Sequence, residues 1–150
     1  MDRKPEINRI TLALIALFLS GQALAEKTYG DLIVTKLVRV YDGDTIYVDV
    51  ETLPAIIGSE MPIRIRGINT PEIGQHAKCE KEHEIGIKAK IFVEERLKNA
   101  AKIELLNISR GKKYFRISAD VVYDGKPIAP EVIQMGLGVV YGVKKDWCAD

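Results

Sequence analysis

Residues 32–50 read LIVTKLVRVYDGDTIYVDV, and this stretch sets the architecture that we expect for the chain. Its first part, Leu32–Tyr41, is rich in β-branched residues, which favour an extended strand. Asp42-Gly43 is a strong tight-turn dipeptide, and Thr45–Val50 then alternates apolar and polar side chains. The stretch therefore predicts two antiparallel strands joined by a tight turn.

Further strands are expected after this hairpin. Pro62–Ile68 alternates isoleucine with arginine, which is the period of a strand with one buried face. Lys102–Ile108 and Lys113–Tyr123 predict a fourth and a fifth strand, and Leu137–Tyr141 is a candidate to return to the sheet. Thr52–Met61 contains a proline and a glycine, so we expect a loop there.

One long helix is predicted over Glu80–Ala100. Charged residues, Glu82 among them, are expected on its solvated face, and a shorter helix is expected over Pro130–Met135. Five short antiparallel strands with a helix inserted after the third predict a five-stranded OB-type barrel, a mainly β variant of the α+β class. The apolar residues of the long helix recur at three- and four-residue spacing and form one stripe: Ile85, Ala89, Phe92, Val93, Leu97 and Ala100.

Residues 1–25 have the pattern of an export signal. A basic start is followed by Ile10–Leu19, which has no charge, and then by a small-x-small cleavage pattern. We expect cleavage between Ala25 and Glu26, which leaves one mature domain over 26–150 in the periplasm or outside the cell. The alternative is an uncleaved membrane anchor, although about 20 apolar residues are needed to span a bilayer.

The charge balance excludes one class of protein. The chain has 22 Lys and Arg against 21 Asp and Glu, a formal net charge of +1. Residues 1–25 hold three of the basic and two of the acidic residues, so the mature domain has 19 of each. A protein that packages nucleic acid by bulk positive charge is therefore excluded. A protein that holds phosphate with a few placed arginines is not.

Acidic and basic residues gather at the ends of the predicted strands. Asp44 can supply oxygen to a hard cation such as Ca²⁺, and Glu72 can take a proton from water. Arginines match phosphate oxygens and offset the charge that grows in a transition state. This combination suits phosphodiester chemistry, and its parts are Asp42-Gly43-Asp44-Thr45, Arg64, Asn69-Thr70-Pro71-Glu72 and Arg116.

In order and spacing these motifs resemble the thermonuclease family, the staphylococcal-nuclease-like domains. The family has a DGDT turn, an arginine five residues before a D-T-P-E turn, and a Y-G-R strand followed eight residues later by D-G. The resemblance runs from about Val38 to Tyr141, and Gly136-Leu137-Gly138 is similar to the family's G-L-A. The matching residues here are Asp42–Thr45, Arg64, Asn69–Glu72, Tyr114–Arg116 and Asp124-Gly125.

The resemblance implies a calcium-dependent endonuclease that cleaves DNA and RNA with little sequence preference and leaves 3′-phosphate ends. Its partner would be a nucleic-acid substrate, and no stable protein partner is predicted. By position, Asp44, Asn69 and the backbone carbonyl of Thr70 would bind Ca²⁺. Asp42 would support the metal site through its contacts with these ligands.

The resemblance also implies the catalytic residues. Glu72 would be the general base for the attacking water. Arg64 and Arg116 would clamp the phosphate, and Arg116 would also assist departure of the leaving oxygen. Tyr114 and Tyr141 are candidates to stack on a nucleotide base, and packing in the barrel core is the alternative for both.

Two residues depart from the family pattern. Asn69 replaces the family's second metal aspartate, and the lost negative charge is expected to weaken Ca²⁺ binding. Phe115 replaces the glycine between Tyr114 and Arg116. These departures favour an alternative, a non-catalytic OB-fold module that binds single-stranded nucleic acid, and a secreted protein-binding module is a further alternative. The intact general base and both arginines favour the enzyme.

Two cysteines, Cys79 and Cys148, remain in the mature chain, an even number that allows one bridge. The Trp147-Cys148 end resembles a shorter exported subgroup of the family, which implies a Cys79–Cys148 disulfide. Free thiols are one alternative. Another is a zinc site of His76, Cys79 and His83, which have ligand-like spacing but no fourth ligand.

Overall fold

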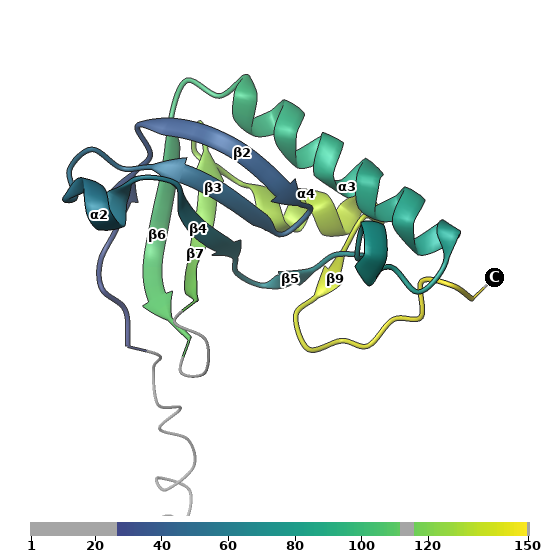
Figure 1. Cartoon of the computed structure of the whole chain (residues 1–150). Coiled ribbons are helices and arrows are strands. Elements are labelled where there is room, and N and C mark those ends of the chain that lie inside the picture. Colours follow the sequence, from purple (N-terminus) through teal and green to yellow (C-terminus); the bar gives the residue numbers. More distant parts are fainter. Residues whose placement is uncertain (1–26, 112–115, 150) are drawn as a thin grey trace, which may run out of the picture.

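The computed structural model describes residues 27–111 and 116–149 (Figure 1). The predicted export signal, Tyr114 and Phe115 lie outside the described residues. Among the residues that are described, no helix is long and apolar enough to cross a membrane.

A curled sheet forms most of the molecule, and helices pack against it (Figure 1). Its strand order is β1-β6-β7-β4-β3-β2. The short strand β8 lies outside this order and pairs with the end of β7. Neighbouring strands are antiparallel except β4 and β7, which are parallel, so the expectation of antiparallel pairing throughout was wrong for this pair. The strands are β1 (Leu32–Ile33), β2 (Lys36–Asp42), β3 (Thr45–Asp49), β4 (Met61–Ile65), β6 (Ile103–Arg110), β7 (Ile117–Tyr123) and β8 (Lys126–Pro127).

The sheet curls because its two outer strands, β1 and β2, are consecutive in the sequence. The Val34 N–H donates to the Ile103 carbonyl of β6 at 3.0 Å. The next residue, Thr35, donates its N–H to the Asp49 carbonyl of β3 at 2.8 Å. This short connection bonds to β6 and β3, the second strand from each end of the strand order, so it brings the two edges of the sheet together as in an OB-type barrel. The predicted strand over Leu32–Tyr41 is therefore split into two.

The predicted α+β, OB-type fold is confirmed, and the number of strands is the main difference. β5 (Ile68–Asn69) and β9 (Val139–Val140) form a small antiparallel sheet of their own, so the last predicted strand does not join the main sheet. The expected loop over 52–61 contains one helical turn, α2 (Ala55–Gly58), and a 3-10 turn, η1 (Gly74–His76), follows β5. α4 (Ile128–Gln134) forms the short C-terminal helix.

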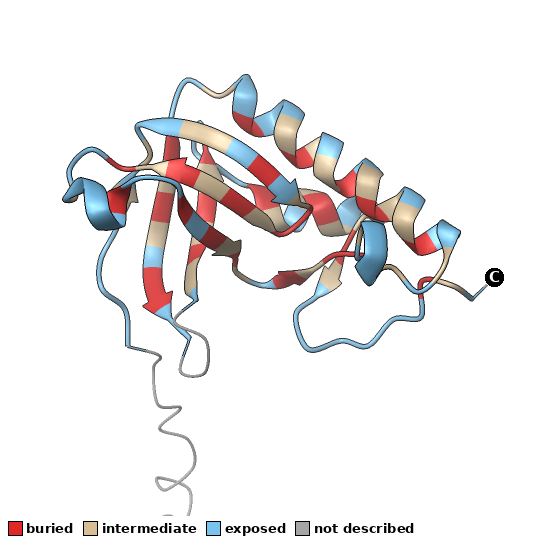
Figure 2. Cartoon of the chain, in the orientation of Figure 1, coloured by how far each residue is buried: buried red, intermediate tan, exposed pale blue. Residues whose placement is uncertain are grey.

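The long helix α3 (Glu80–Lys98) packs along β2. Buried and exposed residues alternate along it (Figure 2). Ala89, Val93 and Leu97 are buried as predicted, but the stripe continues through Gly86 rather than Ile85. The expectation that Glu82 lies on the solvated face was wrong, because its side chain is only 5% exposed. Its carboxylate accepts backbone N–H groups from the preceding loop.

The core lies inside the curl of the sheet and beneath α3 and α4. Full burial of one large apolar side chain contributes about 1.5–3 kcal/mol to the stability of the folded state. On β4 the alternation of side chains also sets the direction of Arg64. Ile63 and Ile65 point into the core, and Arg64 between them points to the opposite face of the sheet. The largest fully buried side chains are Ile46, Ile63, Ile65, Ile68, Leu97, Leu105 and Ile128.

Candidate functional site

The turn between β2 and β3 is pressed against the rest of the fold. Asp42 pairs with Thr45 across it. At Gly43 an added Cβ would lie 2.7 Å from Cβ of Ala89 on α3 and 2.8 Å from Cγ2 of Thr70. Only glycine fits such a close approach. The next residue is consequently buried beneath the turn.

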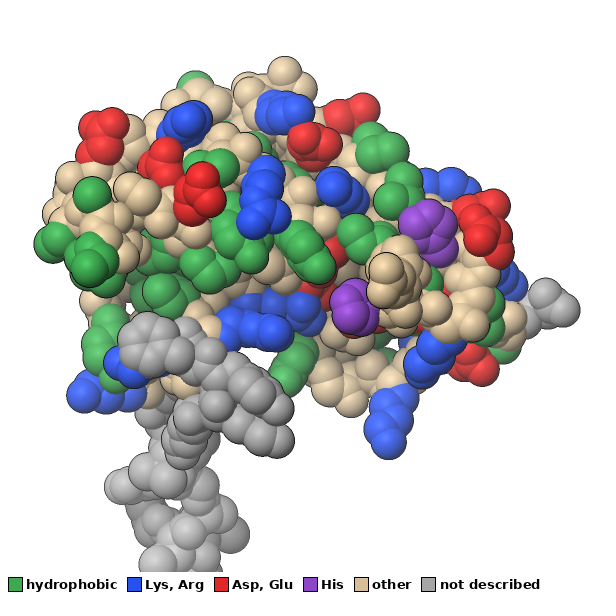
Figure 3. Space-filling view, viewed as in Figure 1, with side chains coloured by type: hydrophobic (Ala, Val, Ile, Leu, Met, Phe, Trp, Pro, Cys, Tyr) green, Lys and Arg blue, Asp and Glu red, His purple; other side chains and the backbone are tan. Residues whose placement is uncertain are grey.

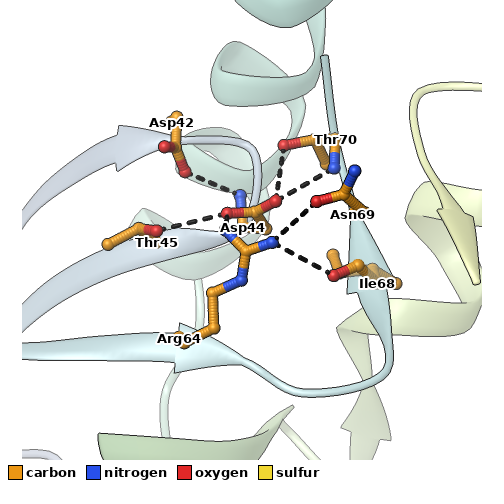
Figure 4. A network of polar contacts seen from close by, with 7 residues as sticks. All are labelled: Asp42, Asp44, Thr45, Arg64, Ile68, Asn69 and Thr70. Carbon is orange, nitrogen blue, oxygen red and sulfur yellow. Dashed lines mark hydrogen bonds and ion pairs between the residues drawn. The ribbon is translucent and has the colours of Figure 1, made fainter. Parts of the chain in front are cut away.

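That buried residue, Asp44, is the centre of a closed polar network (Figure 4). Its Oδ1 pairs with the Arg64 guanidinium and accepts the Thr45 hydroxyl at 3.2 Å. Its Oδ2 accepts the Thr70 N–H at 2.9 Å and the Thr70 hydroxyl at 3.1 Å. The Asp44 N–H donates to Asp42 Oδ1 at 3.0 Å. These partners matter because burying an unpaired carboxylate is strongly unfavourable.

Arg64 joins this network to β5 and to the solvent. Its Nη2 donates to Asn69 Oδ1 at 3.0 Å and, at 3.5 Å, to the Ile68 carbonyl. Its side chain is 17% exposed. Burial lowers the pKa of Arg64, Asp42 opposes this change, and Arg116 adds to it. The guanidinium still carries its charge at neutral pH, because arginine is always protonated there.

Asp42 lies at the edge of the network. Burial raises the pKa of Asp42 above its ordinary value, while Arg64, Thr45 and Arg116 act against that increase. The charges of Arg64 and Arg116 therefore both act on Asp42, although the three residues belong to three different segments of the chain.

A cleft of about 550 Å³ opens beside the network. Figure 3 shows basic side chains and both histidines on this face. Arg64 pairs with Ser118 across the parallel strands β4 and β7, and Arg116 lies two residues before Ser118, on the same face. The structure therefore brings Arg64, Glu72 and Arg116 together, and Asp44 is not in the cleft lining. The residues that line the cleft are Tyr41, Asp42, Thr45, Tyr47, Pro62, Arg64, Glu72, His76 and Arg116.

The loop that carries Glu72 is anchored on the first turns of α3. Glu82 Oε1 accepts the Glu72 N–H at 3.5 Å, and its Oε2 accepts the Lys78 N–H at 2.7 Å. At Gly86 an added Cβ would lie 2.8 Å from the carbonyl oxygens of both Pro71 and Glu72. The helix thus contacts the loop backbone directly, and it leaves the Glu72 side chain exposed in the cleft.

Sequence reasoning missed Glu82 and Gly86, although each has a recognisable signal. Glu82 is the third residue after the N-cap Cys79, whose Sγ accepts the Glu82 N–H at 3.4 Å. An acid at this place is the pattern of a capping box, in which the carboxylate turns back to backbone N–H groups. A glycine inside a helix costs stability relative to alanine, so its presence indicates close packing.

Tyr141, one of the two predicted stacking residues, is not among the residues that line the cleft. Tyr141 is 71% exposed, so the alternative of core packing is wrong for it. Its N–H donates to the Gly67 carbonyl at 2.9 Å. Stacking of Tyr141 on a base stays a prediction. Tyr114 belongs to the residues that the structure does not describe.

Cys79 and Cys148 form a disulfide. This bond contradicts the alternatives of free thiols and of a zinc site that uses Cys79. In the described ranges 27–111 and 116–149, no group of three or more His, Cys, Asp or Glu side chains is arranged to hold a metal.

The donors at the predicted calcium site are all oxygens, which is the type that Ca²⁺ takes. They are the Asp44 carboxylate, the Asn69 amide oxygen and the Thr70 carbonyl, with the Asp42 carboxylate beside them. Asp44 and Asn69 are neighbours, because Nη1 and Nη2 of the same Arg64 guanidinium contact their side-chain oxygens. The chemistry of this donor set fits a hard cation.

Comparison with known proteins places this chain in a family. The family model described as staphylococcal nuclease homologue matches residues 62–149, which is more than half of the chain. The matched range contains Arg64, Asn69, Glu72 and Arg116 and begins after the turn that carries Asp44. No curated protein matches the chain.

Proposed function

Because this chain belongs to the family of staphylococcal nuclease homologues, we propose that it is an exported nuclease that hydrolyses phosphodiester bonds of DNA or RNA. One observation carries the proposal: Arg64, Glu72 and Arg116 line the same cleft. Two arginines suit a phosphate group, and a carboxylate beside them suits activation of water. Such a set suits hydrolysis of a phosphodiester.

Glu72 is the general base of the proposed reaction. Its carboxylate is exposed in the cleft, while its backbone is held by Glu82 and by the close contact at Gly86. An anchored backbone limits the positions that the carboxylate takes, and correct positioning accounts for a large part of catalysis. Glu72 takes the proton of the attacking water.

The two arginines bind the phosphate oxygens from one face of the sheet. Arg64 is half-buried, so its charge is less screened by water than that of a surface arginine. Arg116 is exposed just before β7 begins, and it assists departure of the leaving oxygen. Both offset the negative charge that grows on the phosphorus oxygens in the transition state.

Calcium is the proposed cofactor, in keeping with the general calcium dependence of this family. Asp44, the Asn69 amide oxygen and the Thr70 carbonyl would hold it, and Asp42 would support them. When bound, the cation would act as a Lewis acid on the phosphate and would strengthen electrostatic stabilisation of the transition state.

The test is cleavage of single-stranded DNA by the purified protein with Ca²⁺ or with a chelator. We expect cleavage only with Ca²⁺, and we expect Glu72→Gln to lower kcat by about a hundredfold or more, because a general base contributes that much. Glu84→Gln, an exposed change of the same charge on α3, serves as the control. Cleavage that resists chelation, or that is unchanged in Glu72→Gln, would contradict the proposal.

A second candidate is a non-catalytic module that binds single-stranded nucleic acid. It is favoured by the network around Asp44, in which Arg64, Thr45 and Thr70 already engage both carboxylate oxygens, and by the uncharged Asn69. Binding of single-stranded DNA without cleavage at any calcium concentration would support this candidate over the enzyme.

Export through residues 1–25, with cleavage before Glu26, is part of the proposal. The Cys79–Cys148 disulfide supports it, because such bonds persist in oxidising compartments outside the cytoplasm. The mass of the protein recovered from the culture medium or the periplasm tests it, since processing at the expected place leaves Glu26 at the N-terminus.

A further inference from the structure

A second hollow of about 800 Å³ lies beside the cleft, between β2, η1 and α3. Tyr41 and His76 line both hollows, so the two adjoin each other and are together called the groove. Arg39 and Lys90 add positive charge to the second part. Figure 3 shows basic side chains and the two histidines along this face. A groove of this kind extends the site beyond one phosphate group.

A layered cluster stands where the two hollows meet. The Arg39 guanidinium carbon lies 3.6 Å from the ring centroid of Tyr47 and 5.9 Å from that of Tyr41. The two ring centroids are 6.4 Å apart, and their planes are tilted by 56°. Tyr47 is half-buried, whereas Tyr41 is 43% exposed and Arg39 is exposed as well. The half-buried Tyr47 ring thus packs against the inner face of the Arg39 guanidinium, and Tyr41 and Arg39 are exposed to the solvent.

We propose that Arg39 and Tyr41 form a base-stacking subsite for a nucleotide adjacent to the one that is cleaved. A tyrosine ring and a guanidinium plane both stack on the faces of unpaired bases, and every base has such a face. Tyr47 holds the Arg39 plane in place through their cation–π contact. The subsite rests on the proposed function, since it positions the strand for the cleft beside it.

The subsite requires single-stranded substrate. Bases in a duplex are stacked on their neighbours, so Arg39 and Tyr41 do not reach their faces. The mature domain has no net charge, and stacking supplies affinity that bulk charge does not. Single strands are therefore expected to bind more tightly than duplex of the same length.

The test measures binding in the Glu72→Gln protein with a chelator present, because both conditions are expected to slow cleavage of the probe. The probe is a fluorescent thymidine oligomer of about ten nucleotides, within the range of single-strand site sizes, and binding is followed by anisotropy. We expect Tyr41→Ala and Arg39→Lys each to weaken binding about fivefold or more, which is the lower end of one stacking contact. Arg39→Lys keeps the charge and removes the plane, and Tyr41→Phe, which keeps the ring, should bind normally.

Two controls separate stacking from charge and from misfolding. Lys36→Ala removes an exposed charge from the same strand outside the groove and should leave binding unchanged. An abasic oligomer of equal length should bind Arg39→Lys and the parent protein equally. Unchanged binding in Tyr41→Ala and Arg39→Lys, or equal losses for the thymidine and abasic probes, would overturn the subsite.

Cleavage by the protein with Glu72 intact is measured in parallel. Normal cleavage together with unchanged binding in the subsite variants overturns the subsite and leaves the nuclease standing. Absence of cleavage together with weakened binding overturns the nuclease and supports the subsite. Absence of both cleavage and binding overturns the two proposals together.

Discussion

At Asn69 an amide stands where the family pattern has a carboxylate. Asn69 Oδ1 accepts from Arg64 at 3.0 Å, and the same guanidinium pairs with Asp44. Arg64 therefore faces one negative charge from these two residues rather than two. Because ligand charge is one of the properties that tune calcium affinity, we expect the site to bind Ca²⁺ more weakly than one with two carboxylates.

Asn69→Asp is expected to lower the calcium concentration needed for half-maximal cleavage several-fold, because the new carboxylate attracts the cation. A calcium titration of the cleavage rate measures this change. Asn99→Asp adds the same charge at the far end of α3 and is the matched control. An unchanged titration curve would show that the amide is already an adequate ligand.

At the scale of elements, α3 positions both halves of the candidate site. Its first turns hold the loop of Glu72 through Glu82 and the close contact at Gly86. Its middle presses on the acidic turn, where Gly43 approaches Ala89. Glu72 and the buried Asp44 therefore keep their relative positions, because one helix contacts both segments.

Glu82→Gln is expected to lower the free energy of unfolding by about 1–3 kcal/mol, because an amide nitrogen would face one of two backbone N–H donors. It should also lower kcat with little change in KM, since Glu72 is less firmly positioned. Chemical denaturation and steady-state kinetics measure the two effects, with the exposed Glu84→Gln as control. A folded variant with normal kcat would limit Glu82 to a structural role.

The hydrogen bond between Tyr123 of β7 and Glu131 of α4 leads to a prediction about the pH dependence of stability. The Tyr123 hydroxyl donates to Glu131 Oε1 at 2.5 Å, and burial, followed by this acid, raises the pKa of Tyr123 above 10.0. The folded protein then keeps a proton that the unfolded chain loses. Stability should therefore fall as the pH rises above 10.0.

Tyr123→Phe should remove this part of the alkaline decline. At neutral pH it should cost about 1 kcal/mol for the lost hydrogen bond. The free energy of unfolding measured at neutral pH and above pH 10.0 checks both effects, and the exposed Tyr29→Phe is the control. An alkaline decline of the same size in Tyr123→Phe would contradict this assignment.

At the scale of the whole molecule, the disulfide ties the C-terminal segment to the start of α3. Cys148 lies 69 residues after Cys79, so the bond closes a long part of the chain. Next to it, Trp147 is 7% exposed and Lys145 lies 4.1 Å from its ring centroid. The bond therefore joins the last segment to the N-cap of the helix that anchors Glu72.

Reduction of this disulfide should lower the free energy of unfolding by about 2–4 kcal/mol, because the unfolded chain gains conformational entropy when the bond is broken. Denaturation with and without a reductant measures the loss, and intact mass after alkylation shows the state of the thiols. The Cys79→Ser/Cys148→Ser double variant should show the same stability with and without reductant. Equal stability of the oxidised and reduced protein would contradict the prediction.

Local patterns predicted most of the elements. Alternation and the Asp42-Gly43 turn indicated the hairpin, and the spacing of Ala89, Val93 and Leu97 indicated the long helix. The spaced motifs also indicated residues that the structure places in one cleft, Arg64, Glu72 and Arg116. Local patterns did not predict the burial of Glu82, because a charged residue on a helix ordinarily lies on the solvent-exposed face.

The order of residues along this chain was sufficient for the hairpin, the long helix and the family motifs, because each depends on neighbours within a few positions. Closure of the sheet, the burial of Glu82 and the layering of Arg39 on Tyr47 were not accessible in this way. Each depends on contacts between different elements of the fold. Such contacts form only when burial of the core brings those elements together, and tertiary packing then decides which polar groups find partners.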